Sequence, residues 1–371
     1  MKKITLVLGF LISFGAQAQQ KVPVNWKLGP FIRPTNVNPI ISPDSTNKFF
    51  DPIKQKQIDW ESNDTFNPAA TLKDGKIYVL YRAEDKSGKG IGQRTSRIGL
   101  AESKNGTAMV RAKSPVLFPK NDNQKEFEWA GGCEDPRVAV TANGTYVMMY
   151  TQWNNKVPRL AVATSKDLKT WKKHGPAFRY AYNGKFFNLP TKSASILTSV
   201  INNKLTITKI KGKYWMYWGE ANVYGATSTD LINWSPVVNT SGALKVLFSP
   251  RKGYFDSQLT ECGPPAVLTA KGIVLMYNGK NLPGKDGDER YTANAYCAGQ
   301  ALFSAQDPEV LLSRLDQPFL IPSEPFEKSG QYPAGTVFIE GLVYFKQKWF
   351  LYYGCADSRV AVAIFDPRGS K

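Results

Sequence analysis

Three short segments of this chain place a polar or acidic side chain at or just before a proline. They are Asn67-Pro68, Glu134-Asp135-Pro136-Arg137 and Glu261-Cys262-Gly263-Pro264. Two further acids, Glu220 and Asp357, each follow an aromatic-rich segment. General acid–base catalysis needs one carboxylic acid that gives up a proton and one carboxylate that accepts it. The sequence therefore points first to chemistry carried by carboxylates.

Other catalytic arrangements find little support in the sequence. The cysteines, Cys133, Cys262, Cys297 and Cys355, lack the paired spacing of zinc ligands, and the single His174 lies in a Lys-rich segment. With no histidine to activate a thiol, we expect small buried cysteines rather than nucleophiles. In an oxidising compartment two disulfides are permitted, and the sequence leaves their formation open. No cofactor and no metal are expected.

A repeated unit along the chain must position the acids. Turns at Gly75, Gly144, Gly212, Gly272 and Gln347 each open into an aromatic-rich segment, at intervals of about 60 to 75 residues. A segment of small residues follows each of them about a dozen positions later. Alternation of aromatic and β-branched positions between turns predicts antiparallel strands. The repeat predicts an all-β fold, a five-bladed β-propeller with four strands in each blade around a central channel.

The propeller explains how distant acids meet. The innermost strands line the channel, so residues at the same end of each inner strand gather at one opening. Proline is tolerated at the start of a strand and favours an extended conformation for the residue before it. We therefore expect Asn67, Asp135 and Glu261 to point into one funnel, with Glu220 and Asp357 at its rim.

A funnel of acids without a metal motif or a phosphate-binding loop fits an uncharged, hydroxyl-rich substrate. Glycosidic bond cleavage uses one carboxylic acid to protonate the leaving oxygen and one carboxylate to activate water. Trp129, Trp153 and Trp218 are nearest in sequence to the acidic segments and are candidate sugar platforms. Any one acid alone fits a salt bridge or a turn cap equally well. Several acids at equivalent positions favour catalysis.

The chain is strongly basic, with 48 Lys and Arg residues against 30 Asp and Glu residues and a formal net charge of +18. The lysines are scattered through turns such as 169–173 and 209–213 and form no continuous stripe or nucleic-acid motif. We expect no nucleic-acid partner. The expected result is a solvated basic surface that is attracted to an anionic wall or membrane.

Residues 1–18 have the pattern of a cleaved secretion signal. Lys2 and Lys3 precede an apolar run over residues 4–14, and Ala16-Gln17-Ala18 supplies the small residues of a cleavage site. The run is too short for an integral membrane segment. We expect export to the periplasm or beyond, and a single propeller domain over residues 19–371 in which residues 19–65 wrap the outside or complete the last blade. The sequence carries no indication of the oligomeric state.

The series of motifs resembles glycoside hydrolase family 130, whose members are five-bladed propellers that act on β-mannosides. The motifs follow one another in the family's order over nearly the whole chain after residue 18: Asn67-Pro68-Ala69-Ala70, Tyr81-Arg82, Ser96 to Ala101, Glu134 to Arg137, Ser165 to Leu168 with Trp171, Gly263-Pro264-Pro265 and Tyr353 to Asp357. The resemblance implies a mannose-containing oligosaccharide as substrate. It also implies that Asp135 is the general acid, delivering its proton through a hydroxyl of the bound mannose.

The resemblance implies further contacts to the mannosyl unit from Asn67, Arg82, Arg97 and Asp357. We add Glu134 and Arg137, from the same motif as Asp135, to the candidate substrate-binding residues.

The chain departs from the phosphorylases of this family at two places. They tend to carry a His-Arg-Pro type segment where this chain has Trp218-Gly219-Glu220, and Tyr-His-Gly where it has Tyr277-Asn278-Gly279. Glu261 adds another negative charge. Carboxylates repel a phosphate dianion but not water, and a carboxylate that deprotonates water contributes about 10² to 10⁴ in rate. The leading hypothesis is an exported, inverting, exo-acting β-mannosidase for β-1,2-linked mannosides.

In this hypothesis Asp135 is the acid, and Glu220 or Glu261, or both, steer the attacking water. Inversion predicts a separation of about 6.5 to 9.5 Å between the carboxyl groups of acid and base. One alternative is a β-mannoside phosphorylase that binds phosphate through Arg137, Arg159 or surface lysines and releases mannose 1-phosphate. Another is a non-catalytic propeller that binds mannan.

Overall fold

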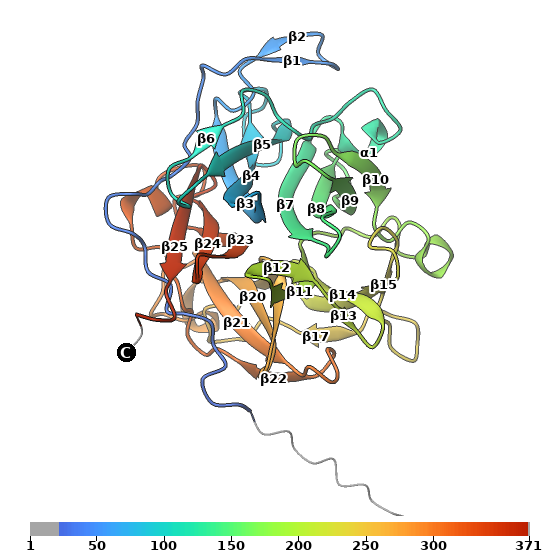
Figure 1. The fold of residues 1–371 in the computed structure, drawn as a ribbon, viewed down its shortest axis with the longest axis vertical. Coiled ribbons are helices and arrows are strands. Elements are labelled where there is room, and N and C mark those ends of the chain that lie inside the picture. Colours follow the sequence, from blue (N-terminus) through green and yellow to red (C-terminus); the bar gives the residue numbers. More distant parts are fainter. Residues whose placement is uncertain (1–21, 370–371) are drawn as a thin grey trace, which may run out of the picture.

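The computed structural model describes residues 22–369, so the expected secretion signal at residues 1–18 lies outside the described part of the chain. Blades of mainly antiparallel strands surround a common axis, and the fold is the five-bladed β-propeller that the repeat predicts (Figure 1). No helix within residues 22–369 has the length and apolar character needed to cross a membrane.

Each blade follows its predecessor in the sequence. Blade 1 contains β3 (Asp64–Lys73), β4 (Lys76–Glu84), β5 (Ser96–Ser103) and β6 (Val110–Arg111). After the short helix α1 (Lys125–Glu128), blade 2 contains β7 (Gly132–Val140), β8 (Tyr146–Trp153), β9 (Arg159–Ser165) and β10 (Lys172–Pro176). Blade 3 contains β11 (Ala194–Ile201), β12 (Lys204–Ile207), β13 (Lys209–Ile210), β14 (Lys213–Trp218), β15 (Val223–Ser228), β16 (Trp234–Pro236) and β17 (Val246–Phe248). Blade 4 contains β18 (Leu259–Cys262), β19 (Ala266–Thr269), β20 (Gly272–Lys280), β21 (Tyr296–Phe303) and β22 (Leu311–Arg314). Blade 5 contains β23 (Val337–Phe345), β24 (Lys348–Cys355) and β25 (Arg359–Phe365). Single 3-10 turns lie at Ala181–Gly184, Gly284–Asp286 and Pro325–Glu327.

The inner strands β3, β7, β11, β18–β19 and β23 run in the same sense along the channel. Each begins at one opening, which we call the acidic end, and leads to a hairpin turn at the other opening, which we call the turn end. The register fixes this sense, because Lys73 pairs with Lys76 and Val140 with Tyr146 across two of these turns. The second strand of each blade runs in the opposite sense, from the turn end to the acidic end. The turns that open the aromatic segments of the repeat, such as those at Gly75 and Gly144, therefore lie at the turn end.

The channel is packed below the acidic end. Ala70, Val138, Thr198, Pro265 and Leu342 come from the five inner strands and line a cavity of about 10 Å³ between them. A cavity of this size holds about one water molecule. The inner strands therefore leave no open pore between the acidic end and the turn end at this level.

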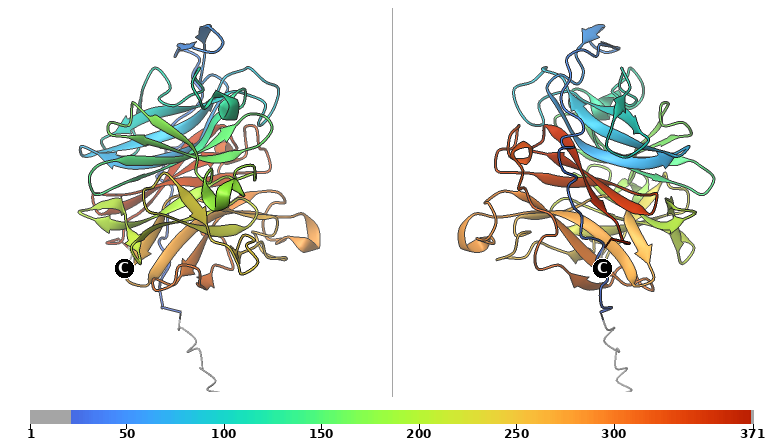
Figure 2. Two further views of the ribbon diagram at one scale, coloured as in Figure 1. Left: turned by 90° about the vertical axis from the view of Figure 1, so that its right-hand side faces the viewer. Right: turned by 60° about the vertical axis from the view of Figure 1, so that its left-hand side comes forward.

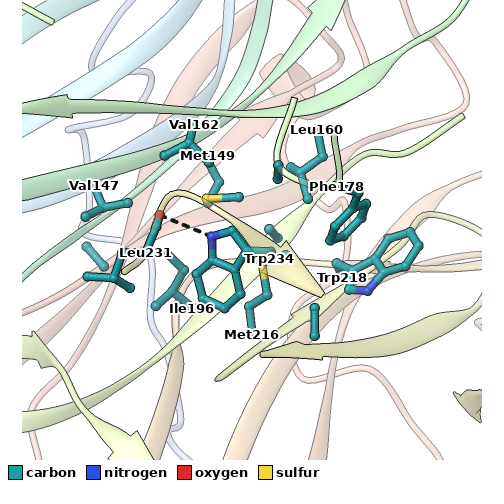
Figure 3. Packing of buried hydrophobic residues seen from close by; sticks show 14 of the residues in the cluster. Val147, Met149, Leu160, Val162, Phe178, Ile196, Met216, Trp218, Leu231 and Trp234 are labelled. Carbon is teal, nitrogen blue, oxygen red and sulfur yellow. Dashed lines mark hydrogen bonds between the residues drawn. The ribbon is translucent and has the colours of Figure 1, made fainter. Parts of the chain in front are cut away.

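Side chains between the blades form the hydrophobic core. Between blades 2 and 3, the ring of Trp218 packs 4.8 Å from that of Phe178, and Met149 and Trp234 fill the same cluster (Figure 3). The Trp234 indole donates to the carbonyl of Leu231 at 3.1 Å, as the dashed line shows. In blade 2 the Trp171 indole donates to the carbonyl of Leu168 in the same way. Part of the sequence repeat is therefore a repeated turn.

The beginning of the chain completes the last blade. Blade 5 has three strands of its own, and the segment around Ile32 and Ile41 lies along the outer edge of β25. Ile364 and Ile32 exchange backbone hydrogen bonds at 2.8 and 2.9 Å, and the amide of Val360 donates to the carbonyl of Ile41 at 2.9 Å. The chain then forms the hairpin of β1 (Phe49–Asp51) and β2 (Lys56–Ile58), which projects beside blade 1 (Figures 1 and 2).

The expected extended conformation before the prolines is wrong. Asn67 and Asp135 have positive φ values of 46° and 48°, in the left-handed region. The strand register shifts at both residues, between Phe66 and Pro68 and between Glu134 and Arg137. Each is therefore the extra residue of a β-bulge, which re-aims a side chain. Asn and Asp tolerate this conformation better than most residues.

The four cysteines are buried and unpaired. Burial raises the pKa of Cys262 and Cys355, so their thiols stay protonated. They pack as small apolar residues, as the sequence predicts.

Candidate active site

The two bulges bring Asn67 and Asp135 into contact at the acidic end. The Asn67 amide donates from Nδ2 to Asp135 Oδ1 at 2.9 Å. Arg82 Nη1 donates to the same oxygen at 3.0 Å. Three residues from β3, β4 and β7 therefore meet at one carboxylate, as the propeller geometry predicts for inner-strand ends.

Arg82 is the buried cation at the centre of this group. Its Nη2 lies 2.7 Å from Glu84 Oε1 and 2.8 Å from Glu134 Oε1, while its Nη1 contacts Asp135. The guanidinium also lies over the ring of Phe66, 4.6 Å from its centroid. Arg82 is thus shared among three carboxylates, of which Glu84 also contacts Arg94 and Asp135 also contacts Lys192.

Lys192 joins the two sides of the funnel. Its Nζ lies 3.4 Å from Asp135 Oδ2 and 3.9 Å from Glu220 Oε1. Glu220 is the most exposed of the predicted acids, with 49% of its side chain accessible, on the loop that follows β14. The separation of these two carboxylate oxygens cannot exceed the sum of the two distances. The acid from blade 2 and the acid from blade 3 therefore face each other across an ammonium group.

Glu261 lies deeper, on β18, and is buried. The Ser193 hydroxyl donates to its Oε1, and Arg137 Nη2 lies 3.8 Å from the same oxygen. Arg137 is committed elsewhere: Nη1 donates to the Asp135 carbonyl at 3.0 Å, and Nη2 lies 2.9 Å from Glu340. Arg137 therefore supports the acids from below, and its one nitrogen without a partner, Nε, is buried.

Burial and nearby charges divide the acids into two classes. Burial would raise the pKa of Asp135, but Arg82 and Lys192 outweigh it and hold this pKa below its usual range. Burial raises the pKa of Glu134 to about 7, although Arg82 opposes the rise. Burial also raises the pKa of Glu261 to about 7, against Lys192. At neutral pH the funnel therefore contains both an ionised carboxylate and carboxyl groups that readily take up a proton.

Asp357 completes the rim from blade 5. Burial raises its pKa to about 7, with Arg82 lowering and Asp135 raising it, so it lies within electrostatic reach of both. The backbone carbonyl of Asp357 accepts a hydrogen bond from Gln331 at 2.9 Å. Asp357 has a φ of 49°, so it shares the left-handed conformation of Asn67 and Asp135.

Arg97 is the one predicted site residue that the structure keeps away from this group. Its side chain is fully buried and pairs with Asp51 at 2.5 Å and Asp85 at 3.0 Å. Its Nη1 also donates to the carbonyl of Thr95. Arg97 therefore ties the hairpin of β1 and β2 to blade 1.

The expectation of a sugar platform fails for Trp218. This side chain is 2% exposed, packs in the core and donates to the Gly225 carbonyl at 3.1 Å, so no sugar can reach it. Trp129 and Trp153 are partly exposed, and the Trp153 indole donates to Gly92 at 2.8 Å. The sequence argument was based on distance along the chain, which does not report which face of a strand a side chain occupies.

A pair of tyrosines at the acidic end was missed. The rings of Tyr296 and Tyr332 lie 5.4 Å apart, and Lys280 Nζ lies 5.3 Å from the Tyr296 centroid. Burial raises the pKa of Tyr296, and the charges of Glu261 and Asp357 raise it further. These rings therefore border the acidic group on the side of blades 4 and 5.

Lys192, Glu84 and Glu340 were also missed, although the repeat contained a signal for two of them. Lys192 lies two residues before β11, the inner strand of blade 3, and next to Ser193, whose positive φ of 57° matches those of Asn67 and Asp135 in blades 1 and 2. Glu340 stands at a register shift in β23, the inner strand of blade 5. Comparing the same position in all five blades finds both residues.

Comparison with known proteins identifies the family of this chain. A family model described as beta-1,4-mannooligosaccharide phosphorylase matches residues 36–368. The chain belongs to glycoside hydrolase family 130. A 1,2-beta-oligomannan phosphorylase of Thermoanaerobacter sp. (strain X514) is 30% identical over 327 residues, which cover 86% of this chain and 95% of the relative.

Two solved structures are more similar. One comes from work on glycoside hydrolases, within this family of mannoside phosphorylases, that target β-1,2 mannosidic linkages in Candida mannan. It is 64% identical, with a TM-score of 0.92, and the match covers 95% of this chain and 98% of that one. The other, a glycosyl hydrolase from Bacteroides ovatus, is 65% identical, with a TM-score of 0.91 and coverages of 94% and 97%. The chain is therefore an enzyme of a family that acts on mannosides.

Proposed function

We propose that this enzyme hydrolyses β-1,2-linked mannosides by an exo-acting, inverting mechanism. The observation that carries the proposal is the position of two glutamates, Glu220 and Glu261, around Lys192 on the side of the funnel opposite Arg82. The packed channel supports exo action, because a sugar chain that reaches the acidic end cannot thread through the propeller.

The charge around Lys192 supports water rather than phosphate as the nucleophile. Lys192 is a single positive charge that already contacts Asp135 and Glu220, and Glu261 adds a further acid beside it. At 4 Å each pair of unit charges in water interacts by about 1 kcal/mol, and by several times more where water is excluded. A phosphate dianion would meet more repulsion than attraction here, whereas water would meet none.

The cations named for a phosphate site are already engaged. Arg137 is buried and contacts Glu340 and two backbone carbonyls. Arg159 donates to Asn188 and to the Phe187 carbonyl, away from the acids. The nitrogens that lack a partner, Arg137 Nε and Arg159 Nη1, are buried, so neither side chain presents a pair of accessible donors to a phosphate group.

In the proposed reaction, Glu220 or Glu261 accepts a proton from water as the water oxygen bonds to the anomeric carbon. The glycosidic bond breaks, and the leaving oxygen receives a proton that originates on Asp135 and passes through a hydroxyl of the sugar. In the resting site Arg82 and Lys192 keep Asp135 ionised. The adjacent Glu134, with a pKa of about 7 and bound to the same guanidinium, supplies the proton that Asp135 takes up when sugar fills the funnel.

The test is a product assay with β-1,2-mannobiose in the presence and absence of inorganic phosphate. We expect mannose at the same rate in both, with inverted configuration in the first product that nuclear magnetic resonance detects. Formation of mannose 1-phosphate only when phosphate is present would overturn hydrolysis. Release of no product from any β-mannoside would overturn catalysis itself.

Phosphorolysis is the second candidate, because Lys192 supplies one cation at the funnel and the 30% identical relative is named a phosphorylase. The same assay separates the two reactions.

We also propose that the enzyme is exported, from the pattern of residues 1–18. N-terminal sequencing of the protein from the periplasmic fraction tests this. A mature chain that begins near residue 19 is the expected result, and an intact Met1 in the cytosolic fraction would contradict it.

A further inference from the structure

The turn end of the propeller carries many lysines that have no acidic partner. Lys166, Lys204, Lys209, Lys211, Lys213 and Lys346 all lie in or beside its turns. Among residues 22–369, none of these six forms an ion pair with a carboxylate. Solvated surface lysines normally alternate with acids, and these six are positive charges at this end without a direct carboxylate partner.

Residues from four blades, 1, 2, 3 and 5, enclose a hollow at this end. The hollow has a volume of about 420 Å³ and is lined by Lys73, Lys166 and Lys204, with Asn202 and Asn203 between them. Lys73 pairs with Asp74 at 2.5 Å, which leaves the hollow with a net positive charge. It is separated from the acidic end by the packed channel. A negatively charged group of modest size fits this hollow.

Exposed aliphatic side chains stand beside these lysines. Val200 and Ile201, at the end of β11, are 40% and 43% exposed. Val24 is 81% exposed, and the neighbouring Asn25 carbonyl accepts a hydrogen bond at 2.7 Å from Lys271, in the turn between β19 and β20. Because β11 and β19 are paired in parallel, these two groups lie at adjacent turns.

The combination of lysines and aliphatic side chains distinguishes between anionic partners. A glycan-binding surface would present aromatic rings, but Tyr146 and Phe345, the rings of the hollow, are 5% and 7% exposed. Basic side chains that surround small exposed aliphatic groups are typical of proteins that lie on anionic lipid. We propose that the turn end is a docking surface for a membrane rich in anionic phospholipid, with a lipid phosphate in the hollow.

This placement leaves the acidic end facing away from the membrane, where substrate arrives from solution. The proposal does not depend on which reaction the enzyme performs, because the two ends share no residue.

Co-sedimentation of the purified full-length or mature chain with vesicles tests the proposal. One vesicle is phosphatidylcholine alone, and the other contains about 30 mol % phosphatidylglycerol, which creates a negative surface potential. We expect binding to the second only, and its loss in about 1 M NaCl, where the screening length falls to about 3 Å. Equal binding to both vesicles, or to neither, would overturn the proposal.

A matched pair of variants separates this surface from the effect of net charge. Lys204→Glu, Lys211→Glu and Lys346→Glu together reverse three charges at the turn end. The control, Lys86→Glu, Lys89→Glu and Lys285→Glu, reverses three exposed charges on loops at the acidic end. We expect at least a tenfold loss of affinity in the first variant and less than about twofold in the control. Equal losses would mean that net charge alone drives binding and would contradict the docking surface.

Two further arms test the aliphatic groups and the choice of lipid. Val200→Ser with Ile201→Ser should weaken vesicle binding about threefold or more without changing the salt dependence. An unchanged affinity would contradict the insertion of these side chains. Dextran sulfate serves as a soluble polyanion: if it displaces the protein from vesicles completely at equal charge concentration, a polymer fits the surface as well as lipid, and the proposal fails.

Discussion

The two ends of this propeller use charge in opposite ways. At the acidic end, Arg82 and Lys192 are shared among carboxylates that are mostly buried, so each group changes the pKa of the others. At the turn end, lysines such as Lys204 and Lys211 face water without acidic partners. Buried charges interact strongly because water does not screen them, whereas exposed charges act mainly as a long-range field. The same scaffold therefore separates chemistry from surface attraction.

The largest effect that tests this comparison is expected from Asp135→Asn. Asparagine keeps the contacts with Asn67 and Arg82 but cannot transfer a proton, so kcat should fall by about 10² to 10⁴. Steady-state release of mannose from β-1,2-mannobiose measures it, and a thermal melt shows whether the variant is folded. Retention of more than a tenth of the activity would remove Asp135 from the role of acid.

Loss of either proposed base should have the next largest effect. Glu220→Gln and Glu261→Gln should each lower kcat at least about tenfold, since glutamine cannot accept a proton from water. Glu289→Gln, at an exposed site among the loops of the same end, is the control and should keep full activity. Full activity in both of the first two variants would refute the proposed base.

Removal of the shared ammonium should shift the pH dependence rather than abolish the reaction. Lys192 lowers the pKa of Glu261, so Lys192→Met should raise that pKa. A general base works only when deprotonated, and the acid limb of kcat/KM should therefore move to higher pH by about one unit. A pH–rate profile between pH 5 and pH 9 measures the shift. An unmoved acid limb would show that Lys192 does not influence the base.

The smallest expected effect is on stability. Burial raises the pKa of Glu261 to about 7 in the folded protein, from 4.5 for an unperturbed glutamate. The folded state therefore binds more protons between these values, and the stability gained at low pH is lost as the pH rises through 7. Glu261→Gln removes this loss and should raise the free energy of unfolding at pH 8 by about 1 to 3 kcal/mol, with little change below pH 4.5.

Urea unfolding at both pH values measures this difference. At the turn end, Lys211→Gln should change the stability by less than about 0.5 kcal/mol at either pH, because its side chain is exposed and unpaired. A destabilised Glu261→Gln at pH 8 would show that its hydrogen bond with Ser193 outweighs the burial of charge.

The sequence predicts the propeller fold well because the sequence repeat corresponds to a repeated structural unit. Each turn and each aromatic strand recurs, so hydrophobic patterning alone leads to five blades. The inner-strand irregularities are less visible. Asn67 and Asp135 were expected to be extended, yet both are bulge residues, because sheet register depends on partner strands that a local pattern does not contain. The prolines correctly indicated where the site residues lie, but the residues before them are in the left-handed and not the extended conformation.

The sequence also did not predict which polar and aromatic side chains are buried. Arg97 and Trp218 carry residue types suited to sugar binding, but pairing with Asp51 and packing against Phe178 bury them. Their partners lie in distant segments, so no local window reveals them. Lys192 could have been found, since it occupies in blade 3 the level at which other blades place polar side chains.

The contact between the first described residues and β25 sets an order of events during biosynthesis. Ile32 and Ile41 precede blade 1 in the sequence, yet their hydrogen-bonding partners, Val360 and Ile364, follow blades 1 to 4. The ring therefore cannot close before β25 has been synthesised. Until then, four complete blades have an open edge, and removal of either residues 30–41 or β25 should leave that edge unpaired.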